Sequence, residues 1–112
     1  FAGGASAQAE GLDATLATSL ANDLLERIIH TPADQVVATW HGYSEAAGQM
    51  KDANGAVLTD PIYADFGRDV GCYAVYVPQQ SGMAESQNFV LVSVHVHCRG
   101  RQIAVLHRLI SI

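Results

Sequence analysis

The sequence predicts an α+β domain in which a long N-terminal helix packs on an antiparallel β-meander. The first observation is helical periodicity at the front of the chain, from Leu12 to His30, and the second is valine alternation at the back, over residues 89–98 and 102–110. The 112 residues, 49% hydrophobic and 15% charged, suit one domain with a modest core. We therefore expect residues 1–32 to form the helix and residues 33–112 to complete the same domain.

Apolar residues recur at helical spacing near the front of the chain, and polar residues occupy the opposite side. The apolar face consists of Ala17, Leu20, Ala21, Leu24, Leu25, Ile28 and Ile29. Thr31-Pro32 ends the helix, because proline disfavours helical backbone in the residue before it and lacks an N–H donor. A helix from residue 8 to residue 30 would be about 34 Å long at 1.5 Å per residue.

Residues 33–68 mix turn signals with isolated aromatic residues and predict a long, locally ordered connection. Trp40 and Tyr43 are expected to hold this connection against the core. The Asn54-Gly55 pair predicts a tight turn, because both residues tolerate positive φ.

Alternation predicts strands over residues 69–77, 89–98 and 102–110, with the even-numbered valines of the second strand facing the helix. Arg99-Gly100 fits a two-residue hairpin loop and a pairing that places Val94 opposite Val105. The expected helix–sheet core is Leu20, Leu24, Ile28, Val92, Val94, Val96 and Val105.

Two cysteines, Cys72 and Cys98, allow one disulfide in an oxidising compartment. A strand register that places them opposite each other also keeps the apolar faces together, so we expect this disulfide. The alternative is two buried, reduced cysteines that pack as small hydrophobic residues.

Three histidines and a cysteine, His95, His97, His107 and Cys98, suggest a zinc or copper site. Strand alternation places His95 and His97 on one face and Cys98 on the other, with His107 on the face of Cys98. Because these ligands do not converge, the sequence predicts no metal there.

A calcium loop is a second metal candidate, since Asp52, Asn54 and Asp60 supply oxygen ligands. The glycine at position 55 comes too early for an EF-hand, and Tyr63 stands where the bidentate glutamate is needed. An ordinary turn is the preferred interpretation, and we expect no cofactor.

Catalytic motifs are absent from the sequence, which has no Gly-x-Ser-x-Gly and no paired carboxylates, so we predict that the protein is not an enzyme. A net charge of −5 makes nucleic acid an unlikely partner, although Arg99 and Arg101 at the hairpin tip are a candidate contact for DNA or an acidic protein. No stretch reaches the roughly 18 apolar residues of a membrane span, and the first residues do not form a signal peptide.

Four segments occur in an order that resembles type IV pilin-like proteins, particularly V-type minor pilins and I-type minor pseudopilins of type II secretion. These segments are residues 17–28, 52–55, 63–70 and 90–96, the last running into the Arg99-Gly100 hairpin. The resemblance implies a pilin-like fold and a minor subunit that primes or caps a type IV pilus or a type II secretion pseudopilus. Its partners would be other minor pilins or pseudopilins and the major subunit.

Members of that family begin with a leader peptide, a processed and methylated phenylalanine, a glutamate at the fifth mature position and a hydrophobic half-helix. Here Phe1 is followed by Ala5 at that position, so we expect a membrane half that precedes Phe1 and anchors the protein in the inner membrane, with a periplasmic domain that later joins the filament tip. Ala9, Leu12 and Leu16 lie too early to cover a short sheet and are the expected subunit interface. The alternative function is a periplasmic or secreted module that binds a ligand, a metal or DNA.

Overall fold

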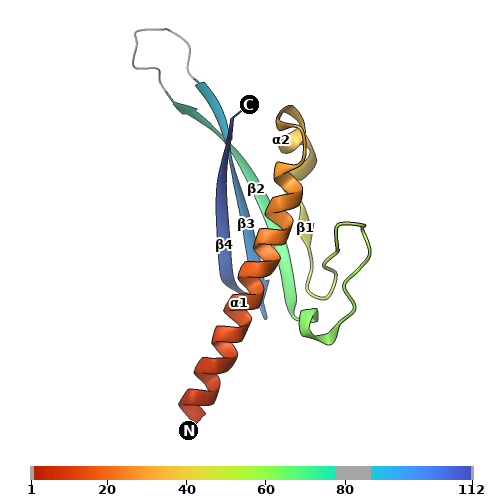
Figure 1. Ribbon diagram of the computed structural model, residues 1–112, viewed down its shortest axis with the longest axis vertical. Coiled ribbons are helices and arrows are strands. Elements are labelled where there is room, and N and C mark those ends of the chain that lie inside the picture. The colour runs from red at the N-terminus through yellow and green to blue at the C-terminus, as the bar shows by residue number, and fades with distance from the viewer. Residues whose placement is uncertain (1, 78–86, 112) are drawn as a thin grey trace.

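The computed structural model describes the backbone of residues 2–77 and 87–111 and the side chains of residues 13–75 and 89–111. The elements are α1 (Ala2–Ile29), η1 (Ala33–Gln35), α2 (Val36–Trp40), β1 (Ser44–Glu45), η2 (Pro61–Tyr63), β2 (Phe66–Val77), β3 (Gln87–Cys98) and β4 (Arg101–Ser111). The strands form one antiparallel sheet in the order β1-β2-β3-β4. Figure 1 shows α1 crossing one face of this sheet, with α2 beside its C-terminal end.

The predicted fold class, a pilin-like fold in which a long helix packs on the sheet, is wrong. Among the side chains of α1 that the structure describes, from Asp13 onward, the buried ones run from Ala17 to Ile28, and α2 adds five residues. About three turns of α1 therefore contribute buried side chains to a sheet whose strands are up to twelve residues long. In the described part of the chain, the architecture is a four-stranded antiparallel sheet with two helices, of which only short segments contribute to the core.

The apolar face predicted for this helix is confirmed. Its residues from Ala17 to Ile28 are buried, and Ile29 is half-buried. The helix ends next to the predicted stop, where the Thr31 N–H donates to the Ile28 carbonyl at 3.0 Å and Pro32 begins the next segment.

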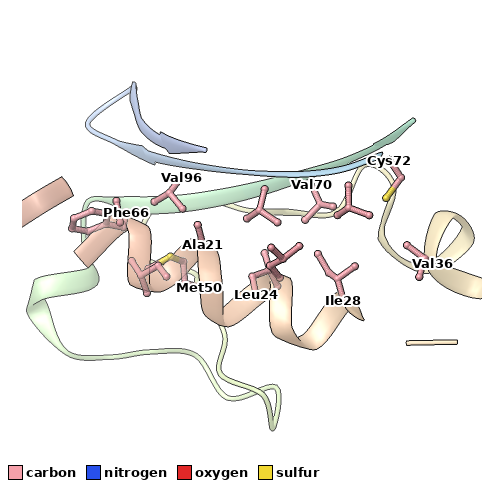
Figure 2. Close-up of a cluster of buried hydrophobic side chains, with 14 of the residues drawn as sticks. Ala21, Leu24, Ile28, Val36, Met50, Phe66, Val70, Cys72 and Val96 are labelled. Atoms are coloured by element: carbon pink, nitrogen blue, oxygen red, sulfur yellow. The ribbon is translucent and has the colours of Figure 1, made fainter. Parts of the chain in front are cut away.

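The core lies between α1 and the valine face of β3, and Figure 2 shows Leu24 and Ile28 directed from the helix toward the sheet. Val92, Val94 and Val96 are fully buried, as predicted. Val36 of α2 and Met50 of the connection are also fully buried at the side of this core. The segment predicted as a mere connection thus contributes to the hydrophobic centre.

Val105 was expected in the core, and this prediction is wrong. An irregularity between Val96 and His97 shifts the register of β3 and β4 by one residue, so Val105 lies opposite His95 instead of Val94. A one-residue shift moves a side chain to the other face of the sheet. Val105 is accordingly 36% exposed, and Leu106 takes the place opposite Val94.

The predicted hairpin loop itself is confirmed. Cys98 pairs with Arg101, and the two loop residues have positive φ, 53° for Arg99 and 78° for Gly100. Such angles are those of the tight two-residue turn that matches the twist of an antiparallel hairpin. The predicted Asn54-Gly55 turn is also present, since Gly55 has φ 85° and an isolated bridge pairs Lys51 with Val57.

Candidate functional site

The most unusual group of polar side chains is centred on an arginine inside the core. Arg68 of β2 is 1% exposed and lies opposite Glu45 of β1, which is 5% exposed. The Arg68 Nε and Nη2 atoms both lie 2.6 Å from Glu45 Oε1. Gly67 permits this approach of β1, because a Cβ atom there would lie 2.7 Å from the Glu45 carbonyl oxygen. The two opposite charges are therefore buried as one pair.

The Arg68 guanidinium also joins elements that are distant in the sequence. Its Nη1 donates to the Leu20 carbonyl of α1 at 3.1 Å, and its Nη2 donates to the Lys51 carbonyl at 2.8 Å. Buried charges are tolerated when they are paired and their remaining donors are bonded. Because the Arg68 side chain is inaccessible, its evident role is to hold the connection against α1 and β2.

Glu45 uses its other oxygen for the same connection. Glu45 Oε2 accepts hydrogen bonds from the Tyr43 hydroxyl and from the Lys51 N–H at 3.2 Å. Burial, together with the hydrogen bond to Glu45, raises the pKa of Tyr43 to about 12. The phenol is therefore a proton donor in this network throughout the physiological pH range.

A second arginine, Arg27 of α1, binds the same segment from the other side. Its Nη1 and Nη2 atoms donate to the carbonyl oxygens of Asp52 and Lys51 at 3.1 and 3.0 Å. Its Nη2 atom lies 3.7 Å from the Asp23 carboxylate, and its buried Nε atom has no hydrogen-bond partner among the described residues. Two arginines therefore converge on the Lys51 carbonyl and fix the start of the turn.

Beside this network lies an open pocket of about 550 Å³ between α1, α2 and the turn. Its lining residues are Asp23, Glu26, Arg27, His30, Trp40, Tyr43, Lys51, Asp52, Ala53 and Gly55. The rings of Trp40 and Tyr43 meet edge to face with centroids 5.0 Å apart. The Trp40 indole donates to the Thr31 hydroxyl at 2.8 Å, which anchors this aromatic wall to the end of α1. The lining thus combines an aromatic wall with three acidic and three basic side chains.

The histidines of the former metal candidate lie mainly on the sheet face opposite α1. His95 Nδ1 lies 3.0 Å from one oxygen of Asp69, and His97 Nε2 contacts the other oxygen. His107 Nδ1 lies 2.7 Å from the Ser93 hydroxyl, and Cys98 is in the core. The one-residue shift in β4 puts His107 on the histidine face, contrary to expectation. Among the described residues, no three His, Cys, Asp or Glu side chains are grouped to hold a metal ion.

The calcium candidate is an Asx turn. One Asp52 carboxylate oxygen accepts the Asn54 N–H at 2.8 Å and the Ala56 N–H at 3.0 Å. Asp60 uses its own carboxylate to accept the Ile62 N–H at 3.1 Å and begin η2. These carboxylates organise their own backbone, as Asp commonly does in turns.

The predicted disulfide is wrong, since Cys72 and Cys98 are both free thiols. In the observed register Cys72 lies opposite Val92, and Cys98 lies opposite Phe66. Six residues of strand separate the two positions, which corresponds to about 20 Å at 3.3 Å per residue. Both side chains are buried, and burial raises the pKa of each thiol.

The predicted subunit-interface residues lie on α1. The side chains of Ala9 and Leu12 are outside the described part, and Leu16 is half-buried against the domain's own core. Next to Leu16, Asp13 and Arg99 line both of two further pockets, of about 470 and 410 Å³, where the helix leaves the sheet. The interface assignment remains a prediction.

No family model, curated protein or solved structure matches this chain. Among the helical residues that the structure describes, no segment combines the length and apolar character needed to cross a membrane.

Sequence reasoning missed Arg68, Glu45 and Arg27. A signal for Arg68 was present in the strand alternation. When β2 is extended back from residue 69, Phe66, Arg68 and Val70 occupy alternate positions and therefore share its buried face. Glu45 carried no comparable signal, since a two-residue strand is too short to show alternation.

Proposed function

We propose that this domain is a non-catalytic assembly subunit that joins its neighbours through the N-terminal part of α1. The observation that carries this proposal is that the backbone of α1 begins at Ala2, whereas among its described side chains, which start at Asp13, the first buried one is Ala17. The stretch from Ala2 to Leu16 is about 22 Å long at 1.5 Å per residue. In Figure 1 this stretch extends past the end of the sheet. A helix that leaves its own domain in this way offers a surface on which another subunit can pack.

The sequence resemblance gives this role a specific form, a minor pilin or pseudopilin that primes or caps a type IV pilus or a type II secretion pseudopilus. Its partners would be other minor subunits and the major subunit. An apolar segment preceding Phe1 would anchor it in the inner membrane before it enters the filament tip. The internal use of Arg68 and Glu45 supports a structural role, because these groups hold the connection against α1 and β2.

The proposal is tested in the native full-length protein with a charge on the projecting helix. Leu12→Glu is expected to abolish filament assembly or secretion and to remove cross-links to neighbouring subunits, because a carboxylate would be buried at the interface. Leu12 is preferred to Leu16, since Leu16 also packs on the core. Ser19→Glu, at an exposed position of the same helix, is the matched control and should leave assembly intact.

Unchanged assembly with Leu12→Glu would refute the proposed interface. The upstream reading frame provides an independent test. A short basic leader followed by an apolar run with an early glutamate supports the proposal, whereas a cleavable signal peptide would contradict the filament assignment.

A further inference from the structure

The pocket between α1, α2 and the Asn54-Gly55 turn has charged side chains that do not belong to the hydrogen-bond network around Arg68. Asp23 lies near two guanidinium groups, 3.7 Å from Arg27 and 3.9 Å from Arg68. Glu26, by contrast, has no ion-pair partner among the described side chains. Among the described residues, the Asp52 carboxylate accepts hydrogen bonds from two backbone N–H groups and forms no ion pair. Two carboxylates, Glu26 and Asp52, thus border the pocket with no ion-pair partner in the described part of the chain.

The walls of the pocket define the kind of cation that suits it. Trp40 and Tyr43 are half-buried and packed on the core, so they present aromatic surface in fixed orientations. A guanidinium group stacks on such rings and donates to carboxylates in the same plane. The volume of about 550 Å³ lies within the roughly 300–1,000 Å³ of small-molecule sites. The pocket therefore has the room and the aromatic surface for an arginine side chain that approaches Glu26 and Asp52 and stays clear of Arg27 and Lys51.

The same chain presents two arginines in a suitable position. Arg99 and Arg101 flank Gly100 in the β3–β4 turn, and both are exposed. The Arg99 side chain is 70% exposed and makes one ion pair, Nε to Asp65 at 3.3 Å, which is also exposed. Exposed pairs of this kind contribute little and exchange readily with another carboxylate. The tight turn holds both arginines on a defined backbone, so binding costs the rotamer entropy of their side chains and little backbone entropy.

The β3–β4 turn that carries Arg99 and Arg101 lies far from the pocket in one molecule. Figure 1 shows the β3–β4 turn at the end of the sheet where α1 leaves it, and α2 at the other end of the domain. The turn of one copy therefore cannot enter the pocket of the same copy. In a second copy, by contrast, the pocket carboxylates are free to bind the arginines of this turn.

We propose that the Arg99–Arg101 turn of one copy inserts into the Trp40–Tyr43 pocket of a second copy, where Glu26 and Asp52 receive its guanidinium groups. This contact goes beyond the proposed function, because it joins two globular domains and does not use the N-terminal part of α1. The chain's net charge of −5 would otherwise keep copies apart, so this local complementarity selects one orientation of encounter.

The test is sedimentation velocity of the purified domain from micromolar to millimolar concentration at low salt. Wild type should associate, and the association should weaken at least tenfold between 20 and 500 mM salt, since the charges are at the surface. A tip variant, Arg99→Gln with Arg101→Glu, and a pocket variant, Glu26→Lys, should each be monomeric. Far-UV circular dichroism checks that both variants remain folded.

Mixing the two variants provides the decisive measurement. The tip variant keeps an intact pocket and the pocket variant keeps an intact turn, so an equimolar mixture should associate although neither variant does so alone. Arg108→Glu is the matched control, because it reverses a basic charge on β4 outside the turn and should leave association intact.

Three results would overturn the proposal. These are a monomeric wild type at millimolar concentration in low salt, a mixture that stays monomeric, or an Arg108→Glu variant as weak as the tip variant. Binding of a short arginine peptide by a wild type that does not self-associate would also reject a second copy as the occupant. None of these outcomes tests the N-terminal part of α1. The assembly role is therefore tested independently, by Leu12→Glu.

Discussion

Arg68 and Glu45 form a fully buried ion pair in which two guanidinium nitrogens, Nε and Nη2, share one carboxylate oxygen at 2.6 Å. Their side chains are 0% and 2% exposed. Taking two charges out of water is expensive, and the expense is offset only when the remaining donors and acceptors are bonded. Here the Leu20 and Lys51 carbonyls accept from Arg68, and the Tyr43 hydroxyl donates to Glu45. The main effect of the pair is therefore to fix the position of the connection against α1 and β2. Its net contribution to the free energy of unfolding is small.

Removing one partner of this pair should be strongly destabilising. Glu45→Gln leaves the buried Arg68 charge with only the exposed Asp23 carboxylate, 3.9 Å away, and breaking a buried pair in this way costs about 3–5 kcal/mol. Chemical denaturation followed by Trp40 fluorescence and far-UV circular dichroism measures the loss. Asp34→Asn, at an exposed acidic position, is the control and should change the free energy of unfolding by less than about 0.5 kcal/mol.

A double variant separates the charge from the packing. Arg68→Met with Glu45→Leu should recover part of the stability lost in Glu45→Gln, since no lone charge remains buried. Recovery should be incomplete, because the Lys51 N–H loses its acceptor. A single Glu45→Gln variant as stable as wild type would show that Arg68 is hydrated and that the pair is not buried as described.

Tyr43 should give the domain a loss of stability at high pH. Its pKa is raised to about 12 by burial and by the hydrogen bond to Glu45, whereas an unfolded tyrosine ionises near about 10. The unfolded state therefore releases its proton first, and this contribution to stability is complete below pH 10 and is lost as the pH rises to 12. Absorbance titration near 295 nm should show a phenol that ionises near pH 12, and Tyr43→Phe should remove it. An unchanged titration in Tyr43→Phe would contradict the assignment.

The sequence predicted the two faces that form the core but not how the segments between them are fixed. The apolar faces of α1 and β3 have long periodic patterns, and both were confirmed. α2 has five residues and no side-chain cap, so neither periodicity nor capping marks it. The pairing of β2 with β3 differs from the expected register by six residues. An even slip keeps every side chain on its face, so alternation alone cannot distinguish the two registers.

The site was harder to predict because it depends on that register and on the connection. Once β2 begins at Phe66, Arg68 faces the core and needs a carboxylate there. That carboxylate, Glu45, comes from a strand of only two residues. Charged residues on a predicted buried face are thus a useful sequence signal, but their partners require the tertiary structure.

The two cysteines should remain reduced in the folded protein. Cys98 lies at one end of the β2–β3 pairing and Cys72 in its middle, six residues away along the strands, which does not allow a disulfide, and burial raises the pKa of both thiols. Both should therefore react slowly with a thiol reagent at pH 8, and two equivalents should react after unfolding without reductant. In Cys72→Ala, one equivalent of the reagent should react after unfolding. No reaction after unfolding would mean that a disulfide had formed.

The shift in β4 gives a direct test of register with two adjacent residues. The regular hairpin expected from the sequence buries Val105, whereas the observed irregularity exposes Val105 and turns Leu106 toward the core. Leu106→Asn should therefore destabilise the domain by about 2 kcal/mol, because a polar group replaces an apolar side chain that packs on the core. Val105→Asn should cost less, about 1 kcal/mol or below, because Val105 is 36% exposed and the substitution mainly lowers strand propensity. The pair serves as its own control, since strand and substituent are the same. The opposite order of effects, measured by urea denaturation, would restore the regular register and return Val105 to the helix-facing side of the sheet.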